Sequence, residues 1–256
     1  MGDRDIIDLK NIEGDIDAKS DVGIILPTYC EAANIERLVK DIESLNLSLL
    51  ILVIDDSSPD GTADTVRNLQ KEFGNILLFI RPKKSGLGTA ITDGFKIFLS
   101  MKHPPKSIMT MDADYSHSPR DLPRFVEPLK NGCDLVIGSR YCRGGGTVDW
   151  SLFRLATSKV ANFIASTLIG VKISDYTSGM RCYSSKLVRN IISDLHSETY
   201  EIQIETIRQS HLRRFKIGEI PITFANRKKG KSKLSFNEIT QFLSYIFFKA
   251  VLNYRH

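Results

Sequence analysis

The sequence predicts an α/β fold in which helices flank a mainly parallel central sheet. From residue 22 onward, short aliphatic runs alternate with helical patterns, which is typical of strands joined by crossover helices. These runs are apolar throughout, so each strand is expected to be buried on both faces. The 256 residues are 42% hydrophobic and 25% charged, which excludes collagen-like, coiled-coil and wholly disordered chains.

The elements of the first half follow a regular order. Strands are predicted at residues 22–26, 49–54, 76–80, 107–111 and 133–138. Helical patterns lie between them at residues 32–46, 60–73, 87–101 and 119–131. In sheets of this kind ligands bind beyond the carboxyl ends of the strands, so the residues that follow each strand are the candidates for a site.

The alternation ends near residue 140. A glycine run at residues 144–146 predicts a flexible loop. The patterns that follow are a helix at 151–169, a short strand near 180–183, helices at 185–194 and 200–213, and a strand at 216–224. Since no clear linker interrupts them, we expect one folded domain over residues 21–235.

The two ends of the chain differ from this domain. Residues 1–20 lack aromatic residues and periodicity, and they are expected to form a flexible acidic tail. Residues 236–256 are expected to form an amphipathic helix with an unusually wide apolar stripe. Packing on the domain and docking on a membrane or a membrane partner are both open for this helix, and the basic run at 227–233 favours docking.

The charge distribution indicates an anionic partner. Formal charge is +5, but residues 1–21 hold seven acidic and three basic residues, so the remainder carries +9. Nucleotides, phospholipids and polyphosphates fit such a charge. A nucleic acid is not expected, because the basic residues are not interleaved with an aromatic stacking platform.

Cysteine usage and hydropathy bear on the compartment. The four cysteines form no CxxC pair, which favours a reducing cytosol over a zinc site or a disulfide framework. The acidic N-terminus does not resemble a signal peptide. No run of about 18 apolar residues is found, so no membrane span is expected.

Polar side chains follow the first two predicted strands. Pro27, Tyr29 and Glu31 could shape a loop that contacts a base, although an ordinary turn before a helix explains them equally simply. Asp55 and Asp56 stand where carboxylates bind ribose hydroxyls or a base N–H. The next carboxylate, at residue 60, is interpreted as a helix N-cap.

A glycine-containing loop precedes the third helix. Gly86 and its neighbours permit close backbone approach at a helix N-terminus, which favours anions. The loop lacks the GK[ST] of a Walker motif and the third glycine of a dinucleotide fingerprint. A plain loop-to-helix junction therefore remains an equal interpretation.

The segment after the fourth strand is the most informative. Asp112 and Asp114 are two residues apart, so in an extended backbone both can face the ligand crevice. Adjacent carboxylates repel unless a cation bridges them. Mg²⁺ or Mn²⁺, completed by a diphosphate, suits this all-oxygen pair. His117 could join such a site, but a structural role is favoured.

Basic residues follow the fifth strand and recur downstream. Arg140 lies next to the glycine run, and arginine binds phosphate through two parallel hydrogen bonds. Arg140 and the basic residues downstream of it together suggest a second, phosphorylated substrate, although each could also be a solvated surface charge. The other members of this set are Arg143, Arg154, Arg181, Arg227, Lys228, Lys229, Lys231 and Lys233.

These motifs occur in the order and spacing of family 2 glycosyltransferases, and the set most resembles the short form of the dolichol-phosphate mannosyltransferases. The resemblance spans roughly residues 22–240 and rests on PTYCE, DDSSPDGT, GLGTA, DADYSHSP, GSRY, SGMR and FANRKKGKSKL. It implies a GT-A (nucleotide-diphospho-sugar transferase) fold whose catalytic domain is residues 21–235.

The resemblance also implies an activity. Mannose would pass from GDP-mannose to dolichyl or another polyprenyl phosphate, with inversion at the anomeric carbon. Asp112 and Asp114 would hold the metal and the diphosphate, and Asp114 is expected to be catalytic together with Arg140 and Arg227. The nucleotide sugar would also contact Pro27, Tyr29, Glu31, Asp55, Asp56 and Gly86. The acceptor phosphate would contact Arg140, Arg227 and Lys233.

Partners and location follow from the same resemblance. The enzyme would act peripherally on the cytosolic face of a membrane, the endoplasmic reticulum in a eukaryote or the plasma membrane in a prokaryote, in some organisms with small membrane subunits. Two departures stand out: Cys30 replaces the usual Asn, and Ser116 replaces a Gln that completes the metal shell in some members. UDP-glucose as donor and a non-catalytic nucleotide-binding membrane adaptor are the alternatives.

Overall fold

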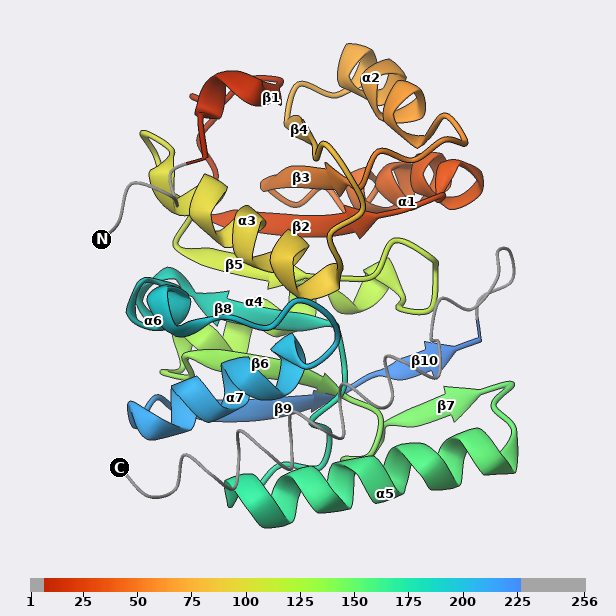
Figure 1. Ribbon diagram of the computed structural model, residues 1–256, viewed down its shortest axis with the longest axis vertical. Helices are drawn as coiled ribbons and strands as arrows, with labels where there is room; N and C mark the ends of the chain where they lie inside the picture. The colour runs from red at the N-terminus through yellow and green to blue at the C-terminus, as the bar shows by residue number, and fades with distance from the viewer. Residues whose placement is uncertain (1–6, 227–256) are drawn as a thin grey trace.

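The computed structural model describes residues 7–226. Its centre is an eight-stranded sheet in the order β1-β4-β3-β2-β5-β8-β6-β9, beside a small sheet of β7 and β10 (Figure 1). The strands are β1 Ile12–Glu13, β2 Val22–Thr28, β3 Leu49–Asp55, β4 Ile76–Ile80, β5 Ser107–Thr110, β6 Leu135–Ser139, β7 Gly146–Val148, β8 Arg181–Ser184, β9 Ile217–Pro221 and β10 Thr223–Ala225. The predicted α/β architecture is confirmed.

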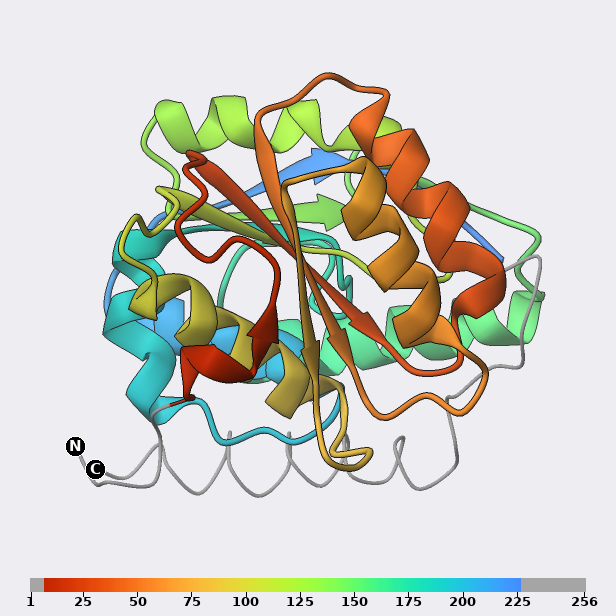
Figure 2. The same cartoon turned by 90° about the horizontal axis from the view of Figure 1, so that it is seen from above.

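Helices cover both faces of the large sheet (Figure 2). Their bounds are α1 Ala32–Glu43, α2 Thr62–Glu72, α3 Leu87–Ser100, α4 Pro123–Lys130, α5 Leu152–Ile169, α6 Ser185–Ile191 and α7 Ile202–Leu212. Short 3-10 turns lie at Leu9–Asn11, Pro119–Asp121 and Ile192–Asp194. Among the described residues, no helix is long and apolar enough to cross a bilayer.

The two faces have separate cores. On one face α1, α2 and α4 pack against the sheet, and α1 does so through Ile35, Leu38, Val39 and Ile42, whose spacing is that of one helical face. On the other face α3, α6 and α7 pack against the alternate side chains of the same strands. Burial on both faces explains why the strands are apolar throughout.

The strand directions place the loops that matter for function. β2 pairs in parallel with both β3 and β5, so the chain leaves all three at the same edge of the sheet. β8 enters antiparallel between β5 and β6, which brings the segment before β8 to that same edge. The short strand predicted near 180–183 is therefore a central strand of the sheet.

Three expectations differ from the structure. The flexible acidic tail was expected over residues 1–20, but Ile12–Glu13 pairs antiparallel with β4 and Ile12 is buried, so this part of the tail is folded. The glycine run at 144–146 leads into β7, which pairs in parallel with β10. The strand predicted at 216–224 is divided between β9 and β10 at Ile222, whose N–H donates to Ser139 of β6 and whose carbonyl accepts from Gly146 of β7. The helix expected at 236–256 lies outside the described residues.

Candidate active site

A cavity lies at the carboxyl edge of the sheet, where β2, β3 and β5 end. Residues from four separate predicted motifs line it together: Pro27, Tyr29, Glu31, Asp56, Gly86, Asp112 and Asp114. The parallel order of the strands accounts for this meeting, because loops far apart in sequence leave the sheet side by side. The predicted donor-side residues are thus gathered at one place, with one exception described below.

Asp56 reaches this cavity as half of a buried ion pair. Its Oδ1 accepts a hydrogen bond of 2.5 Å from Nε of Arg81, and the side chains of both residues are less than one-tenth exposed. Arg81 also donates to the carbonyl of Gly86 at 2.8 Å, so the pair connects the end of β3 to the start of α3. Arg81 was not singled out in the sequence, since a strand end followed by an arginine carries no specific signal.

Asp55 is the exception among the donor-side residues. Its carboxylate is fully buried and does not line the cavity. It accepts hydrogen bonds from Oγ1 of Thr28 at 2.9 Å and from N and Oγ of Ser58 at 2.8 and 2.6 Å. Asp55 therefore holds the turn that follows β3 in place.

Asp60 lies one residue before the N-cap position predicted for it, since Gly61 is the N-cap of α2. Its carboxylate accepts from the N–H of Thr62, the first residue of α2, and from the N–H of Ala32, the first residue of α1, at 3.1 Å each. One side chain therefore satisfies N-terminal donors of both helices that flank the cavity.

Asp112 and Asp114 both line the cavity, although by a different geometry from the one predicted. β5 ends at Thr110, and the chain turns through Tyr115, which has a positive φ of 63°. Asp114 is almost buried, and its Oδ1 accepts from N and Oγ of Ser116 at 3.0 and 2.5 Å. Asp112 stays one-third exposed. Ser116 thus orients one of the two carboxylates.

The surroundings of this pair fit a hard divalent cation. Gly179, from the loop before β8, faces Asp112 so closely that a Cβ there would lie 3.1 Å from Oδ1. The absence of a side chain leaves room beside the carboxylate. No group of three or more His, Cys, Asp or Glu side chains within residues 7–226 is arranged as a metal site. Two carboxylates and space beside them suit a divalent ion that takes oxygen ligands.

His117 lies beneath Asp112 and is fully buried. Its Nδ1 is 3.6 Å from Oδ2 of Asp112, and its ring meets Phe224 edge-on with the centroids 4.9 Å apart. Neither ring nitrogen has a hydrogen-bond partner in the described part of the chain. Burial lowers the pKa of His117 to about 4, so the ring is neutral at pH 7 and packs in the protein interior next to Asp112.

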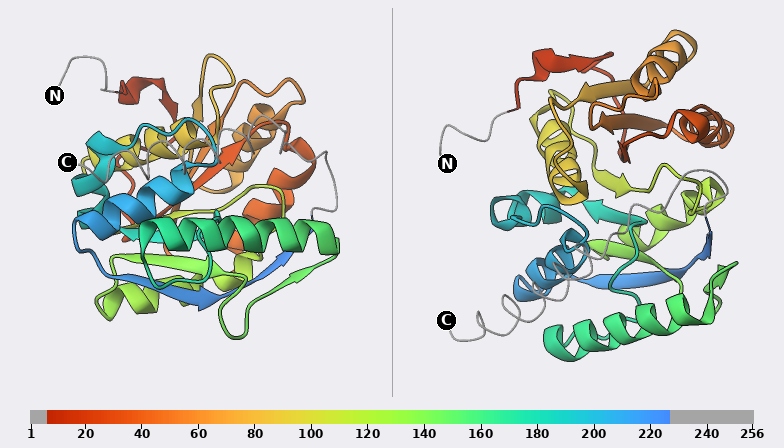
Figure 3. Two further views of the ribbon diagram at one scale, coloured as in Figure 1. Left: turned by 60° about the horizontal axis from the view of Figure 1, so that its bottom comes forward. Right: turned by 45° about the vertical axis from the view of Figure 1, so that its right-hand side comes forward.

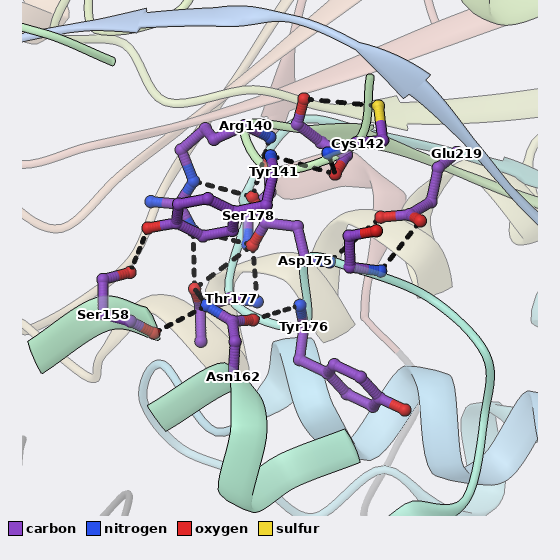
Figure 4. A network of polar contacts seen from close by, with 12 residues as sticks. Arg140, Tyr141, Cys142, Ser158, Asn162, Asp175, Tyr176, Thr177, Ser178 and Glu219 are labelled. Atoms are coloured by element: carbon purple, nitrogen blue, oxygen red, sulfur yellow. Dashed lines mark hydrogen bonds and ion pairs between the residues drawn. The ribbon is translucent and has the colours of Figure 1, made fainter. Parts of the chain in front are cut away.

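Arg140 lines a second cavity and is held by a buried carboxylate (Figure 4). Asp175 accepts from Nε and Nη2 of Arg140 at 2.7 Å each, and from its backbone N–H at 3.0 Å. Thr177 accepts from Nη2 through its hydroxyl at 2.5 Å. Burial by itself raises the pKa of Asp175, but the hydrogen bonds from Arg140 hold that pKa below its usual value.

The loop that carries Asp175 is fixed from two further elements. Glu219 of β9 accepts from the N–H groups of Ser174 and Asp175 at 2.8 and 2.9 Å. On α5, Asn162 accepts from the N–H of Tyr176 at 2.6 Å and donates to the hydroxyl of Thr177 at 3.3 Å (Figure 4). Arg140 therefore sits in a network whose members come from four distant stretches of sequence.

Among the other described basic residues, Arg154 lies over the same two aromatic rings as Arg140, whereas Arg181 lines neither cavity. Arg181 is fully buried, and it donates to the carbonyls of Tyr176, Ser178 and Gln203 at 2.6 to 2.8 Å, so its role is structural. Arg154 stacks over Trp150, 4.0 Å from the ring centroid. Arg143 is exposed and lines neither cavity. Five further predicted cations lie outside the described residues: Arg227, Lys228, Lys229, Lys231 and Lys233.

The sequence analysis missed part of the wall of the first cavity. Lys84 lies over the ring of Tyr29 at 4.4 Å, and Thr199 and Tyr200 line the cavity from the loop before α7. This loop docks on α3, where Gly88 donates to the carbonyl of Glu198 at 2.9 Å. A Cβ at Gly86 would lie 2.3 Å from that carbonyl, so the close approach signalled by the glycines is made by protein backbone.

Comparison with known proteins agrees with the fold. Residues 23–192 match the family model of glycosyl transferase family 2. Polyprenol monophosphomannose synthase of Mycolicibacterium smegmatis is 36% identical over 220 residues, which cover 85% of this chain and 82% of that protein. Undecaprenyl-phosphate mannosyltransferase of Micrococcus luteus is 35% identical over 213 residues, which cover 82% of this chain and 86% of that protein.

Solved structures with a similar fold include glucosyl-3-phosphoglycerate synthase from Mycobacterium tuberculosis. Its complex with Mn²⁺, uridine diphosphate and phosphoglyceric acid superposes with a TM-score of 0.66 at 16% identity, over 90% of this chain and 78% of that chain. Its complex with uridine diphosphate alone gives a TM-score of 0.65 at 16% identity, over 90% and 79% of the two chains. This likeness confirms the predicted GT-A fold, and the family match and the relatives show that the chain is a glycosyltransferase that belongs to family 2.

Proposed function

We propose that this protein transfers mannose from GDP-mannose to a polyprenyl phosphate such as dolichyl phosphate, with inversion at the anomeric carbon and with a divalent metal. The observation that carries the proposal is the meeting of Pro27, Tyr29, Glu31 and Asp56 with the carboxylate pair in one cavity. Relatives named for mannosyl transfer to polyprenol and undecaprenyl phosphates support the choice of sugar and acceptor.

The donor is assigned to the first cavity. Tyr29, with Lys84 over its ring, offers an aromatic face beside which a base can lie, and Glu31 and Asp56 offer acceptors to base N–H groups or ribose hydroxyls. Because Arg81 braces Asp56, that carboxylate is preorganised before the nucleotide arrives.

The diphosphate is assigned to the edge of the cavity that Asp112 and Asp114 form. These two side chains would hold Mg²⁺ or Mn²⁺, which when bound supplies positive charge to the departing nucleoside diphosphate. Ser116 fixes the orientation of Asp114 for this task. The neutral ring of His117 packs next to Asp112 and adds no charge to the site.

The acceptor is assigned to the side of Arg140. A phosphate monoester is mostly dianionic at pH 7, because its second pKa is near 6, and it is then nucleophilic without a general base. One of its oxygens would form the new bond to C1 of mannose while the bond from C1 to the diphosphate oxygen breaks, so GDP leaves. Arg140 lowers the repulsion between the two anionic substrates, together with Arg227 and Lys233.

The acceptor also fixes where the enzyme works. Polyprenyl phosphates reside in membranes, so we propose peripheral action on the cytosolic face of a membrane, with a small membrane subunit as a further partner. This is the endoplasmic reticulum in a eukaryote and the plasma membrane in a prokaryote. The lipid acceptors in the relatives' names support this placement.

The proposal is tested first by donor binding. Calorimetric titration with GDP-mannose, UDP-glucose, GDP and UDP, each with and without Mn²⁺ or Mg²⁺, should show metal-dependent binding of the GDP compounds. Radiolabelled mannose should then pass from GDP-mannose to a short-chain polyprenyl phosphate in detergent. If UDP-glucose binds and GDP-mannose does not, the donor is UDP-glucose. If a nucleotide sugar binds and no sugar is transferred, the protein is a nucleotide-binding adaptor.

A further inference from the structure

Helix α5 presents an apolar face to solvent. The large hydrophobic side chains exposed on this helix are Leu152, Phe153, Val160 and Phe163, with 85%, 81%, 57% and 71% of their surface accessible. We call these four residues the α5 apolar face. Phe153, Val160 and Phe163 follow one another at intervals of seven and three, so they lie along one side of the helix.

The opposite side of α5 accounts for its attachment to the domain. Asn162 and Ala165 are buried there, and Leu168 and Ile169 pack against the core. Figure 1 and the right view of Figure 3 show the helix along the outer edge of the molecule, and the left view of Figure 3 shows it at the front, not covered by another described element. Packing on the domain therefore explains only one side of α5, and exposed apolar side chains gathered in this way typically mark an interaction surface.

The charges of α5 indicate what this surface contacts. The helix carries Arg154 and Lys159 and contains no Asp or Glu, and Lys172 follows it at an exposed position. Aromatic and aliphatic side chains next to basic ones fit the interface of a bilayer with anionic lipids, where the chains enter the headgroup region and the cations stay at the phosphates.

We propose that the α5 apolar face docks on an anionic membrane surface. The sequence pattern favours residues 236–256 for that role, and it predicts α5 only as a helix. The inference deepens the proposed function and rests on it for its meaning, since the acceptor is a lipid phosphate. Docking by α5 would also place the second cavity at the lipid surface, because Lys159 and Phe163 line that cavity together with Arg140.

The position of α5 relative to Arg140 is fixed by hydrogen bonds. Ser158 accepts from the hydroxyl of Tyr141, the neighbour of Arg140, at 2.7 Å. Asn162 bonds Tyr176 and Thr177 in the loop that holds Asp175. A helix that rests on the membrane through one face is thereby connected to the guanidinium of Arg140 through the other.

The test is partition of the full-length chain onto vesicles, measured by co-sedimentation. The variant Phe153→Ser/Val160→Ser removes two members of the face that do not line either cavity. Leu212→Ser is the matched control, because Leu212 is 58% exposed on α7, outside the face. With phosphatidylcholine–phosphatidylglycerol vesicles, the double variant should partition about tenfold less or weaker still, while Leu212→Ser should match the wild type.

Four outcomes would overturn the proposal. Three concern the vesicles: unchanged partition of the double variant, an equal loss in Leu212→Ser, or equal binding of the wild type to vesicles of phosphatidylcholine alone. The fourth is a wild type that sediments as a dimer and a double variant that sediments as a monomer, which would assign the face to a second copy. Mannosyl transfer to a short-chain acceptor in detergent distinguishes a failure of the docking proposal from a failure of the proposed function. The double variant should retain that transfer, and its absence in the wild type would refute the function while leaving the vesicle result intact.

Discussion

The two cavities of this glycosyltransferase are built around buried Arg–Asp pairs of opposite polarity. At the cavity proposed for the donor, the acid faces the cavity, because Asp56 lines the wall and Arg81 is bonded to it. At the second cavity the base faces the cavity, because Arg140 lines the wall and its partner Asp175 is fully buried. An acid suits ribose hydroxyls and base N–H groups, and a base suits a phosphate.

A buried Arg–Asp pair can thus hold either its acid or its base toward a cavity. A buried ion pair contributes little net stability, since desolvation offsets the attraction between the charges. It does hold the ligand-facing member in a single orientation, which is what recognition needs. The two pairs also differ in how the chain brings their members together. Asp56 and Arg81 follow two adjacent parallel strands, whereas Arg140 follows β6 and Asp175 comes from the loop before the antiparallel strand β8.

The largest expected effect is at the donor side. Asp114→Ala should abolish metal-dependent binding of GDP-mannose and lower transfer by about a thousandfold or more, because charge on the departing diphosphate is then poorly offset. Calorimetry with and without Mn²⁺, followed by the transfer assay, measures both effects. Asp64→Asn, a surface carboxylate of α2, should leave both unchanged. Full activity of the Ala variant would refute the site.

The next effect tests the brace at the second cavity. Asp175→Asn leaves the guanidinium of Arg140 buried without its charge partner, so the free energy of unfolding should fall by about 3–5 kcal/mol. Urea denaturation measures this loss. Asp194→Asn is the control, since its pair with Arg213 lies at the surface and should matter by less than about 1 kcal/mol. The folded variant should still bind the donor. Loss of donor binding would show that the two cavities are not independent.

A smaller effect concerns acid stability. The pKa of His117 is about 4 in the folded protein against about 6.5 in an unfolded chain, so only the unfolded chain takes up this proton between those values. Stability should therefore fall as pH is lowered through this window, by at most about 1.4 kcal/mol per pH unit from this residue. His117→Asn cannot titrate, and its acid limb in chemical denaturation should be shallower. Parallel limbs would contradict this.

The smallest effect concerns Asp55. Thr28→Val removes a buried hydroxyl that donates to this carboxylate, and the free energy of unfolding should drop by about 1–2 kcal/mol. Thr157→Val, at an exposed position of α5, should change it by less than about 0.5 kcal/mol. Equal effects of the two variants in urea denaturation would show that Asp55 does not depend on this bond.

The donor cavity was largely predictable because its residues follow parallel strands. Strand runs that are apolar throughout fix the sheet, and the edge rule then gathers the residues after β2, β3 and β5. Asp55 and Asp56 show the limit of that rule. They are neighbours in sequence, but successive side chains of a strand point to opposite sides, so one lines the cavity and the other is buried in the turn.

The second cavity was less predictable because its contacts are long-range. Arg140 was expected to bind a phosphate, but its partner Asp175 is 35 residues away and lies outside the SGMR motif that marks this loop. Arg181 was placed in the same cation cluster, and its fully buried position follows only from β8 lying between β5 and β6. The exposed face of α5 was missed as well, since apolar spacing alone does not tell a packed side from a solvent-facing one.

The loop at residues 174–180 has a consequence for engineering. Asp175 at its start braces Arg140, and Gly179 near its end lies against Asp112, while Thr110 of β5 donates to the carbonyl of Gly179 at 2.8 Å. This segment therefore connects Asp112 of the first cavity to Arg140 of the second. A chimera that takes the half of the chain around the first cavity from another family member must match this loop as well, or the spacing between the two cavities will change.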